Sequence, residues 1–207
     1  NYSPIFHDAT CSLLKECAII RKLIPANSVS TIFKRPAWQR RWLQAKEKTS
    51  SSVSGIHFGH YRAGAESRII SNYHAMKTTI ALQRGFHLDR WAKGLSVMLE
   101  KSPGVTIIEK LRSILLMEAD FNSSNKEIFG DRMMNNVRIH GLMPGEIFSE
   151  KGKTSGDGTL AKTLYWDIVQ QSRVCAGLAS IDAANCYDSI SHAIASLVFR
   201  ACGVPVE

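Results

Sequence analysis

Three groups of residues in this sequence have types and spacing that suit work on phosphates. Asp182 follows the apolar run 175–181, so a carboxylate would stand at the end of a buried strand, where a divalent cation can bind. Lys110 and Arg112 lie two residues apart, and on a strand they would project from one face and suit a triphosphate. Each pattern also has an ordinary structural interpretation: Asp182 as a helix cap, and the two cations as solvent-facing charge.

The third group is a basic segment, 34–48, in which cations are interleaved with tryptophans. It holds six basic residues and one acidic residue, together with Trp38 and Trp42. Cations next to aromatic rings suit a nucleic-acid backbone with its bases or sugars. The candidate nucleic-acid contacts are Arg40, Arg41, Lys46 and Lys48. The alternative is an amphipathic helix with both tryptophans in the core, since they lie one helical turn apart, and one helix can satisfy both interpretations.

The composition is globular, but the charge is unusual. The chain has 207 residues, 44% hydrophobic and 21% charged, which excludes wholesale disorder, coiled-coil and disulfide-framework architectures. The net charge is +8, and residues 1–100 hold the excess, with 15 basic and 6 acidic side chains. This charge indicates a polyanionic partner. Five cysteines without a C-x-x-C pair, and no apolar run of membrane-spanning length, predict an intracellular protein without a membrane partner.

The elements that must position these groups are predicted to form a mostly helical α+β fold with one β-hairpin. Branched residues favour a hairpin made of 105–108 and 111–117 and centred on 109–110, and the apolar run 175–181 predicts a buried strand. Helices are expected over residues 5–23, after Pro36, in two stretches up to Glu100, and over 122–141, 159–173 and 189–202.

Four blocks stand in an informative order along the chain. They are Ser54–Tyr61 (S-G-I-H-F-G-H-Y), Leu111–Leu116 (L-R-S-I-L-L), Glu146–Lys151 with Asp157–Leu160, and Ser180–His192 (S-I-D-A-A-N-C-Y-D-S-I-S-H). In type and order they resemble the reverse transcriptase domain of non-LTR retrotransposons. The second block resembles the R-P-I-S-L-L fingers block, and the last resembles the first catalytic block of the palm, L-D-x-x-x-A-F-D-x-V-x-H. The resemblance covers about residues 49–207, and its last block is the most specific.

The resemblance implies the fingers and the start of the palm of a right-hand polymerase. We expect a basic helical extension over 1–50, fingers over 51–172 and an incomplete palm over 173–207, with a boundary at the small polar segment 49–55. The parent domain would be an RNA-directed DNA polymerase of a mobile element. Its partners would be an RNA template, a DNA primer and a dNTP, in the nucleus or otherwise associated with nucleic acid, and the pattern allows an endonuclease domain elsewhere in the parent protein.

The resemblance also implies roles for individual residues. Asp182 and the Ala183 carbonyl would bind two catalytic Mg²⁺ ions, which activate the primer 3′-hydroxyl and neutralise charge on the leaving pyrophosphate. Tyr187 falls at the position of a steric gate that excludes a ribose 2′-hydroxyl. Arg112, supported by Lys110, would hold the incoming triphosphate.

Departures from the family pattern limit the expected activity. Ser113 stands where the commoner pattern has Pro, and the sequence contains no Asp-Asp and no Gln-Gly pair. The Y-x-D-D block and the block that grips template and nucleotide would therefore lie beyond Glu207, and we expect the chain alone to be inactive in polymerisation. The alternative is a non-enzymatic, nucleic-acid-binding relic of a retroelement. A template-dependent RNA polymerase palm ranks below both, because Tyr187 would gate against ribonucleotides.

Overall fold

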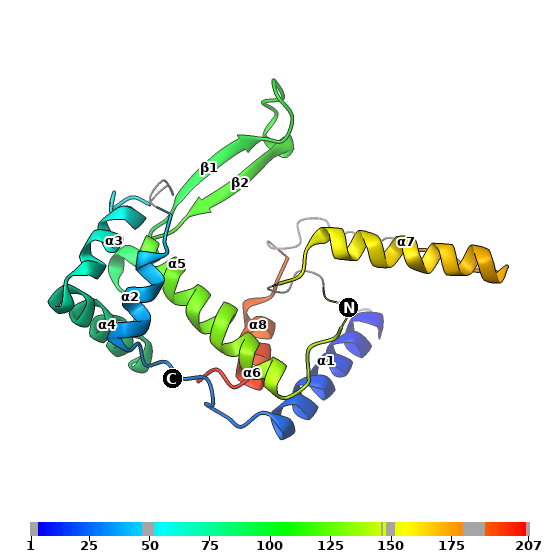
Figure 1. The fold of residues 1–207 in the computed structure, drawn as a ribbon, viewed down its shortest axis with the longest axis horizontal. Helices are drawn as coiled ribbons and strands as arrows, with labels where there is room; N and C mark the ends of the chain where they lie inside the picture. Colours follow the sequence, from blue (N-terminus) through cyan, green and yellow to red (C-terminus); the bar gives the residue numbers. More distant parts are fainter. Residues whose placement is uncertain (1–3, 47–51, 146, 148–151, 180–188, 206–207) are drawn as a thin grey trace.

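A computed structural model describes residues 4–46, 52–145, 147, 152–179 and 189–205. The chain opens with helices α1 (Pro4–Leu23), α2 (Arg35–Leu43), α3 (Phe58–Glu66) and α4 (Arg68–Gln83). The 3-10 turn η1 (Asp89–Ala92) leads into strand β1 (Leu95–Glu100), and η2 (Ile108–Lys110) leads into β2 (Leu111–Leu116). One long helix follows, made of α5 (Ala119–Asn125), the π-helical segment η3 (Lys126–Met133) and α6 (Met134–Ile139) (Figure 1). Helices α7 (Ser155–Ser172) and α8 (His192–Ala201) complete the described chain.

Local capping signals explain where two of the helices begin. The Ser67 hydroxyl accepts a hydrogen bond from the Ile70 amide at the start of α4. At the start of α7, Thr154 Oγ1 accepts from the Asp157 amide while Asp157 Oδ2 accepts from the Thr154 amide, a reciprocal box that places the start at Ser155 rather than at the expected Thr159. The helices expected over 5–23, after Pro36, over 122–141 and over 189–202 are confirmed, with shifts of a few residues at their ends. The two stretches expected up to Glu100 are represented by α3 and α4, which end at Gln83, so the expectation is wrong for the residues beyond it.

The predicted hairpin exists, but its first strand is not the expected one. β1 pairs antiparallel with β2 in a register that matches Leu95 with Leu116 and Glu100 with Leu111. The segment 105–108, expected to be a strand, lies in the connection instead, and residues 95–100, expected to end a helix, form the strand. Whether a segment forms a strand depends on the partner that it pairs with. Residues 95–100 pair with β2 over a longer stretch than 105–108 could, and this pairing outweighs the local strand preference of the branched residues.

The expected buried strand over 175–181 is wrong for its described part. Residues 175–179 follow α7 in a non-regular, exposed conformation, and residues 180 and 181 lie outside the described residues. A buried strand needs neighbouring strands to bind its amide and carbonyl groups. Within the described residues the sheet consists of β1 and β2, which pair with each other.

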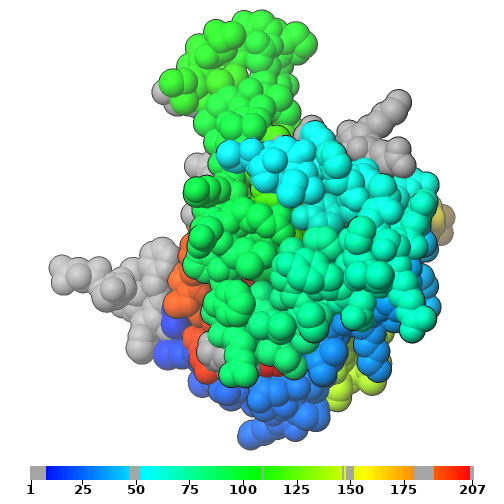
Figure 2. Space-filling model, turned by 90° about the vertical axis from the view of Figure 1, so that its left-hand side faces the viewer, coloured from blue at the N-terminus to red at the C-terminus, as the bar shows by residue number. Residues whose placement is uncertain are grey.

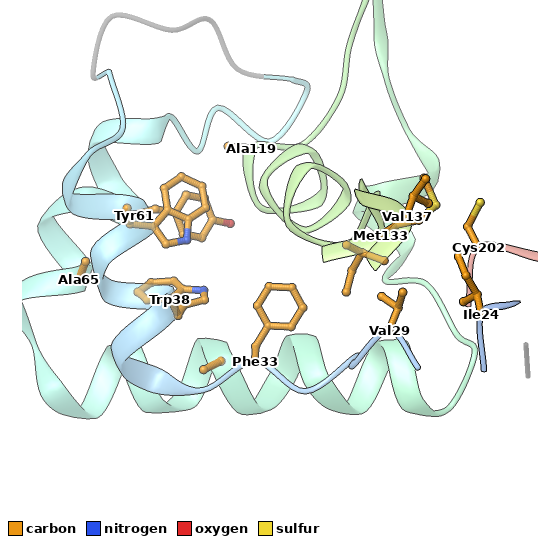
Figure 3. Close-up of a cluster of buried hydrophobic side chains, with 13 residues drawn as sticks. Ile24, Val29, Phe33, Trp38, Tyr61, Ala65, Ala119, Met133, Val137 and Cys202 are labelled. Carbon is orange, nitrogen blue, oxygen red and sulfur yellow. The ribbon is translucent and has the colours of Figure 1, made fainter. Parts of the chain in front are cut away.

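The hydrophobic core lies between α2, α3, α4 and the long helix, and extends to α8. Figure 3 shows Trp38 and Tyr61 at one end of the cluster, Phe33 in its middle, and Met133, Val137 and Cys202 toward the other end. These buried side chains come from each of the three segments predicted above. The division into 1–50, 51–172 and 173–207 stays a prediction.

Two elements project from this core. The β1–β2 hairpin rises clear of the helical body in Figures 1 and 2. Helix α7 extends away from the body in Figure 1 and has no buried residue. Within the part of the chain that the structure describes, no helix is long and apolar enough to cross a membrane.

Candidate nucleic-acid interface

An open cavity of about 760 Å³ lies where the end of α2 meets the start of the long helix. Its wall contains three cationic residues, Arg41, Lys46 and Lys126, and one acidic residue, Asp131. Polar and aromatic side chains complete the wall, among them Asn122, Ser123, Trp42 and Phe58. Two predicted nucleic-acid contacts, Arg41 and Lys46, are thereby brought together with Lys126, which lies far from them in the sequence.

Arg41 is held firmly in the wall of this cavity. Its Nε donates to the carbonyl and the hydroxyl of Ser123, at 3.1 and 3.0 Å, and its Nη1 donates to Glu127 at 2.8 Å and to Asp131 at 2.9 Å. Two carboxylates therefore already compensate its charge. Arg41 ties α2 to η3. Its contacts therefore support a structural role more than a role in binding nucleic acid.

Arg40 and Lys46 are placed differently from Arg41. Both side chains are exposed, Arg40 on the last turn of α2 and Lys46 just beyond the helix. Lys46 and the exposed Lys126 line the cavity, whereas Arg40 is not part of its wall. Lys48 lies outside the described residues.

The two tryptophans of the basic segment belong to the core. Trp38 is 4% and Trp42 2% exposed, and their ring centroids lie 5.9 Å apart. Trp42 stacks on Tyr61 with ring centroids 4.5 Å apart, and Trp38 stacks on His74 at 5.3 Å. The amphipathic-helix interpretation is confirmed for the tryptophans, whose buried faces are not available for stacking on bases.

The cations of the hairpin stand at separate positions. Lys110 ends the 3-10 turn η2, whereas Arg112 is the second residue of β2 and lies opposite Leu99. Both side chains are exposed. Lys110 lies before the strand, so the expectation that both cations lie on one strand is wrong for Lys110, while their role at a triphosphate stays a prediction.

The residues of the predicted magnesium site, Asp182, Ala183 and Tyr187, lie outside the described residues. Their roles stay predictions. Within the described part of the chain, no group of three or more His, Cys, Asp or Glu side chains is placed to hold a metal ion. His57 and His60 instead meet at the start of α3, where the His57 amide donates to His60 Nδ1 at 3.0 Å.

A buried ionic cluster, which is not predicted by the sequence, lies at the base of the hairpin. Arg90 Nη1 donates to Glu118 Oε2 at 2.8 Å, and its Nη2 forms a short contact with Asp120 Oδ2. Trp91 Nε1 donates to Asp120 Oδ1 at 2.9 Å, and Lys77 Nζ lies 3.4 Å from Asp120 Oδ2. The one sign of this cluster in the sequence is the pair Glu118 and Asp120, two residues apart and directly after a predicted strand. Their cationic partners are remote in sequence, so the cluster itself could not be predicted.

This cluster perturbs the titration of its members. Burial raises the pKa of Tyr61 to about 12, and the negative charge of Asp120 adds to that effect. Burial alone would raise the pKa of Glu118, but hydrogen bonds from Ser52, Ser54 and Arg90 outweigh it and hold that pKa below its usual value. Burial lowers the pKa of the Lys77 ammonium, against the attraction of Asp120.

The chain was compared with protein-family models, with curated proteins and with solved structures, and none of the three comparisons finds a match.

Proposed function

We propose that the chain is the fingers and early-palm part of an RNA-directed DNA polymerase of a mobile element, and that it binds nucleic acid at the cavity between α2 and the long helix. The observation that supports binding best is the meeting of Lys46 and Lys126, from segments far apart in the sequence, on one open cavity at the end of α2, the helix that also carries the exposed Arg40. Exposed cations around a groove suit a phosphate backbone, which binds with release of counterions.

The assignment to a polymerase rests on the sequence blocks. Leu111–Leu116 forms a strand that leads into a long helix, and this order agrees with a fingers block followed by its helix. In the proposed enzyme, Asp182 and the Ala183 carbonyl would hold magnesium, which supplies charge neutralisation during nucleotidyl transfer. Arg112 and Lys110 would hold the triphosphate, and the Tyr187 ring would exclude a 2′-hydroxyl.

Binding to a labelled RNA–DNA hybrid, measured by fluorescence anisotropy over a range of salt concentrations, tests the interface. Arg40→Gln and Lys46→Gln should each weaken binding and reduce the slope of log K against log salt by about 1, because each removes about one phosphate contact. Lys162→Gln, the same charge change on the exposed face of α7, is the matched control and should leave binding nearly unchanged. Binding that is insensitive to salt, or equal losses in all three variants, would contradict the interface.

A separate assay addresses the polymerase assignment. Residues 1–207, given Mg²⁺, dNTPs and a primed RNA template, should bind but not extend the primer. Template-dependent DNA synthesis by this chain would show that the expectation of inactivity is wrong. A reading frame that continues into a Q-G block and then Y-x-D-D would support the enzyme, whereas a stop codon directly after Glu207 would support the relic.

A further inference from the structure

The hairpin stands on a root formed by the two segments that flank it. Arg90 and Trp91 lie in η1, just before β1, and Glu118 and Asp120 lie just after β2. The packing partner of each strand is mainly the other strand, and side chains on both strands are largely exposed. The direction in which the hairpin leaves the body, visible in Figure 2, is therefore set at this root.

Arg90 bridges the two segments of the root. One guanidinium nitrogen reaches Glu118 at 2.8 Å and the other contacts Asp120, so one planar side chain spans both carboxylates. The indole of Trp91 adds a hydrogen bond to the second oxygen of Asp120. The segment entering the hairpin is thus tied to the segment leaving it.

The same cluster ties the root to the helical body. Arg90 Nη1 also donates to the Tyr61 hydroxyl of α3 at 3.1 Å, and Lys77 of α4 lies 3.4 Å from Asp120. Ser52 and Ser54, from the segment before α3, donate to the two oxygens of Glu118. Two parts of the body therefore contact the carboxylates at the hairpin root, and a third, helix α3, contacts Arg90.

Because the two carboxylates are buried, they depend on the exact positions of their partners. The side chains of Glu118 and Asp120 are 1% and 4% exposed, so each depends on its protein partners rather than on water. Two carboxylates face two cations, Arg90 and Lys77, and the charges balance. A rotation of the hairpin would separate these partners and leave buried charges uncompensated.

We propose that Arg90 is a positioning residue that locks the hairpin in one direction on the helical body. It acts through Glu118 and Asp120, and it fixes where the exposed cations of the hairpin stand relative to α3 and α4. This inference concerns the direction of the hairpin, so it holds whether or not the hairpin binds a nucleotide.

The distance between the hairpin and the body tests the lock directly. Spin-labelled non-canonical residues at Ser102, in the hairpin connection, and at Arg84, after α4, leave the native cysteines untouched, and both positions are exposed. Double electron–electron resonance should give one narrow distance distribution in the otherwise unchanged chain and a broad one in Arg90→Gln. Arg112→Gln, the same substitution on β2 outside the cluster, should keep the distribution narrow.

Circular dichroism establishes that the helices are intact in each variant. If Arg90→Gln fails to fold, Arg90→Lys replaces it, since lysine keeps the charge but cannot span both carboxylates with a planar fork. A broadened distribution in the folded Arg90 variant, together with a narrow one in Arg112→Gln, would support the lock. An unchanged distribution in a folded Arg90 variant, or equal broadening in Arg112→Gln, would overturn it.

Discussion

At the scale of single residues, His74 is a side chain with a buried polar atom that its surroundings do not satisfy. Its ring stacks on Trp38 and meets Tyr61 and Tyr73 edge-on, yet its buried Nδ1 has no hydrogen-bond partner among the described residues. Burial lowers the pKa of His74, and the nearby positive charge of Lys77 acts in the same direction. The folded protein therefore favours the neutral ring.

His74→Phe should make the protein less sensitive to mild acid. Since the folded-state pKa of His74 lies below 6.5, the unfolded chain takes up the proton first, and the wild-type protein loses stability as the pH falls below 6.5. At pH 8 the two proteins should differ by no more than about 1 kcal/mol, because a phenyl ring keeps the stacking and removes an unpaired polar atom. Urea unfolding at several pH values measures the difference, and an advantage of the variant that stays constant with pH would contradict the argument.

Tyr61 makes the opposite kind of prediction, at high pH. Its pKa of about 12 lies above the ordinary 10.0, so its contribution to stability is fully present below pH 10 and is lost as the pH rises toward 12. Ultraviolet titration of tyrosinate should show a late step, near pH 12. Tyr61→Phe should remove that late step, and a titration in which the late step persists would assign it to another tyrosine.

At the scale of helices and strands, the sequence predicts those features that local signals determine. The helices expected over 122–141 and 189–202 end close to Gly141 and Gly203, and both glycines adopt positive φ angles, of 68° and 88°, as glycines after a helix often do. The identity of β1 was missed because the pairing of Leu95 with Leu116 is a non-local choice. The same holds for the candidate site. The basic helix can be predicted from the sequence, whereas the proximity of Lys46 to Lys126 depends on the fold.

The neighbouring residues Arg40 and Arg41 on helix α2 differ in role: Arg40 carries surface charge, whereas Arg41 makes structural contacts. Arg41→Gln removes contacts to Glu127 and Asp131 that join α2 to η3, and should cost about 2 kcal/mol of unfolding free energy. Arg40→Gln is the matched control and should change that free energy by less than about 0.5 kcal/mol, because its side chain is exposed. Chemical denaturation of both variants measures this contrast, and equal losses would show that the Arg41 contacts add little stability.

At the scale of the whole molecule, the end of the described chain packs against its beginning. Helix α8 contacts α1, and beyond it the Gly203 carbonyl accepts a hydrogen bond from the Val29 amide at 2.9 Å. Asn136, on the long helix, donates to Ser28 Oγ at 2.9 Å and to the Cys202 carbonyl at 3.0 Å. Three segments remote in sequence thus meet around Gly203, and this contact extends the core from the first helix to the last.

Gly203→Ala tests how far stability depends on this closure. A Cβ at Gly203 would clash with Ser28 Oγ and would lie 2.8 Å from Asn136 Nδ2, at a φ of 88°. Gly141→Ala is the control, because its φ of 68° is also positive but a Cβ there meets nothing within 4 Å. The backbone conformation should cost each variant about 1–2 kcal/mol, and crowding should cost Gly203→Ala about 1–3 kcal/mol more. Equal unfolding free energies for the two variants in urea would mean that Ser28 and Asn136 move aside easily, and that the junction of the first and last helices is loosely packed.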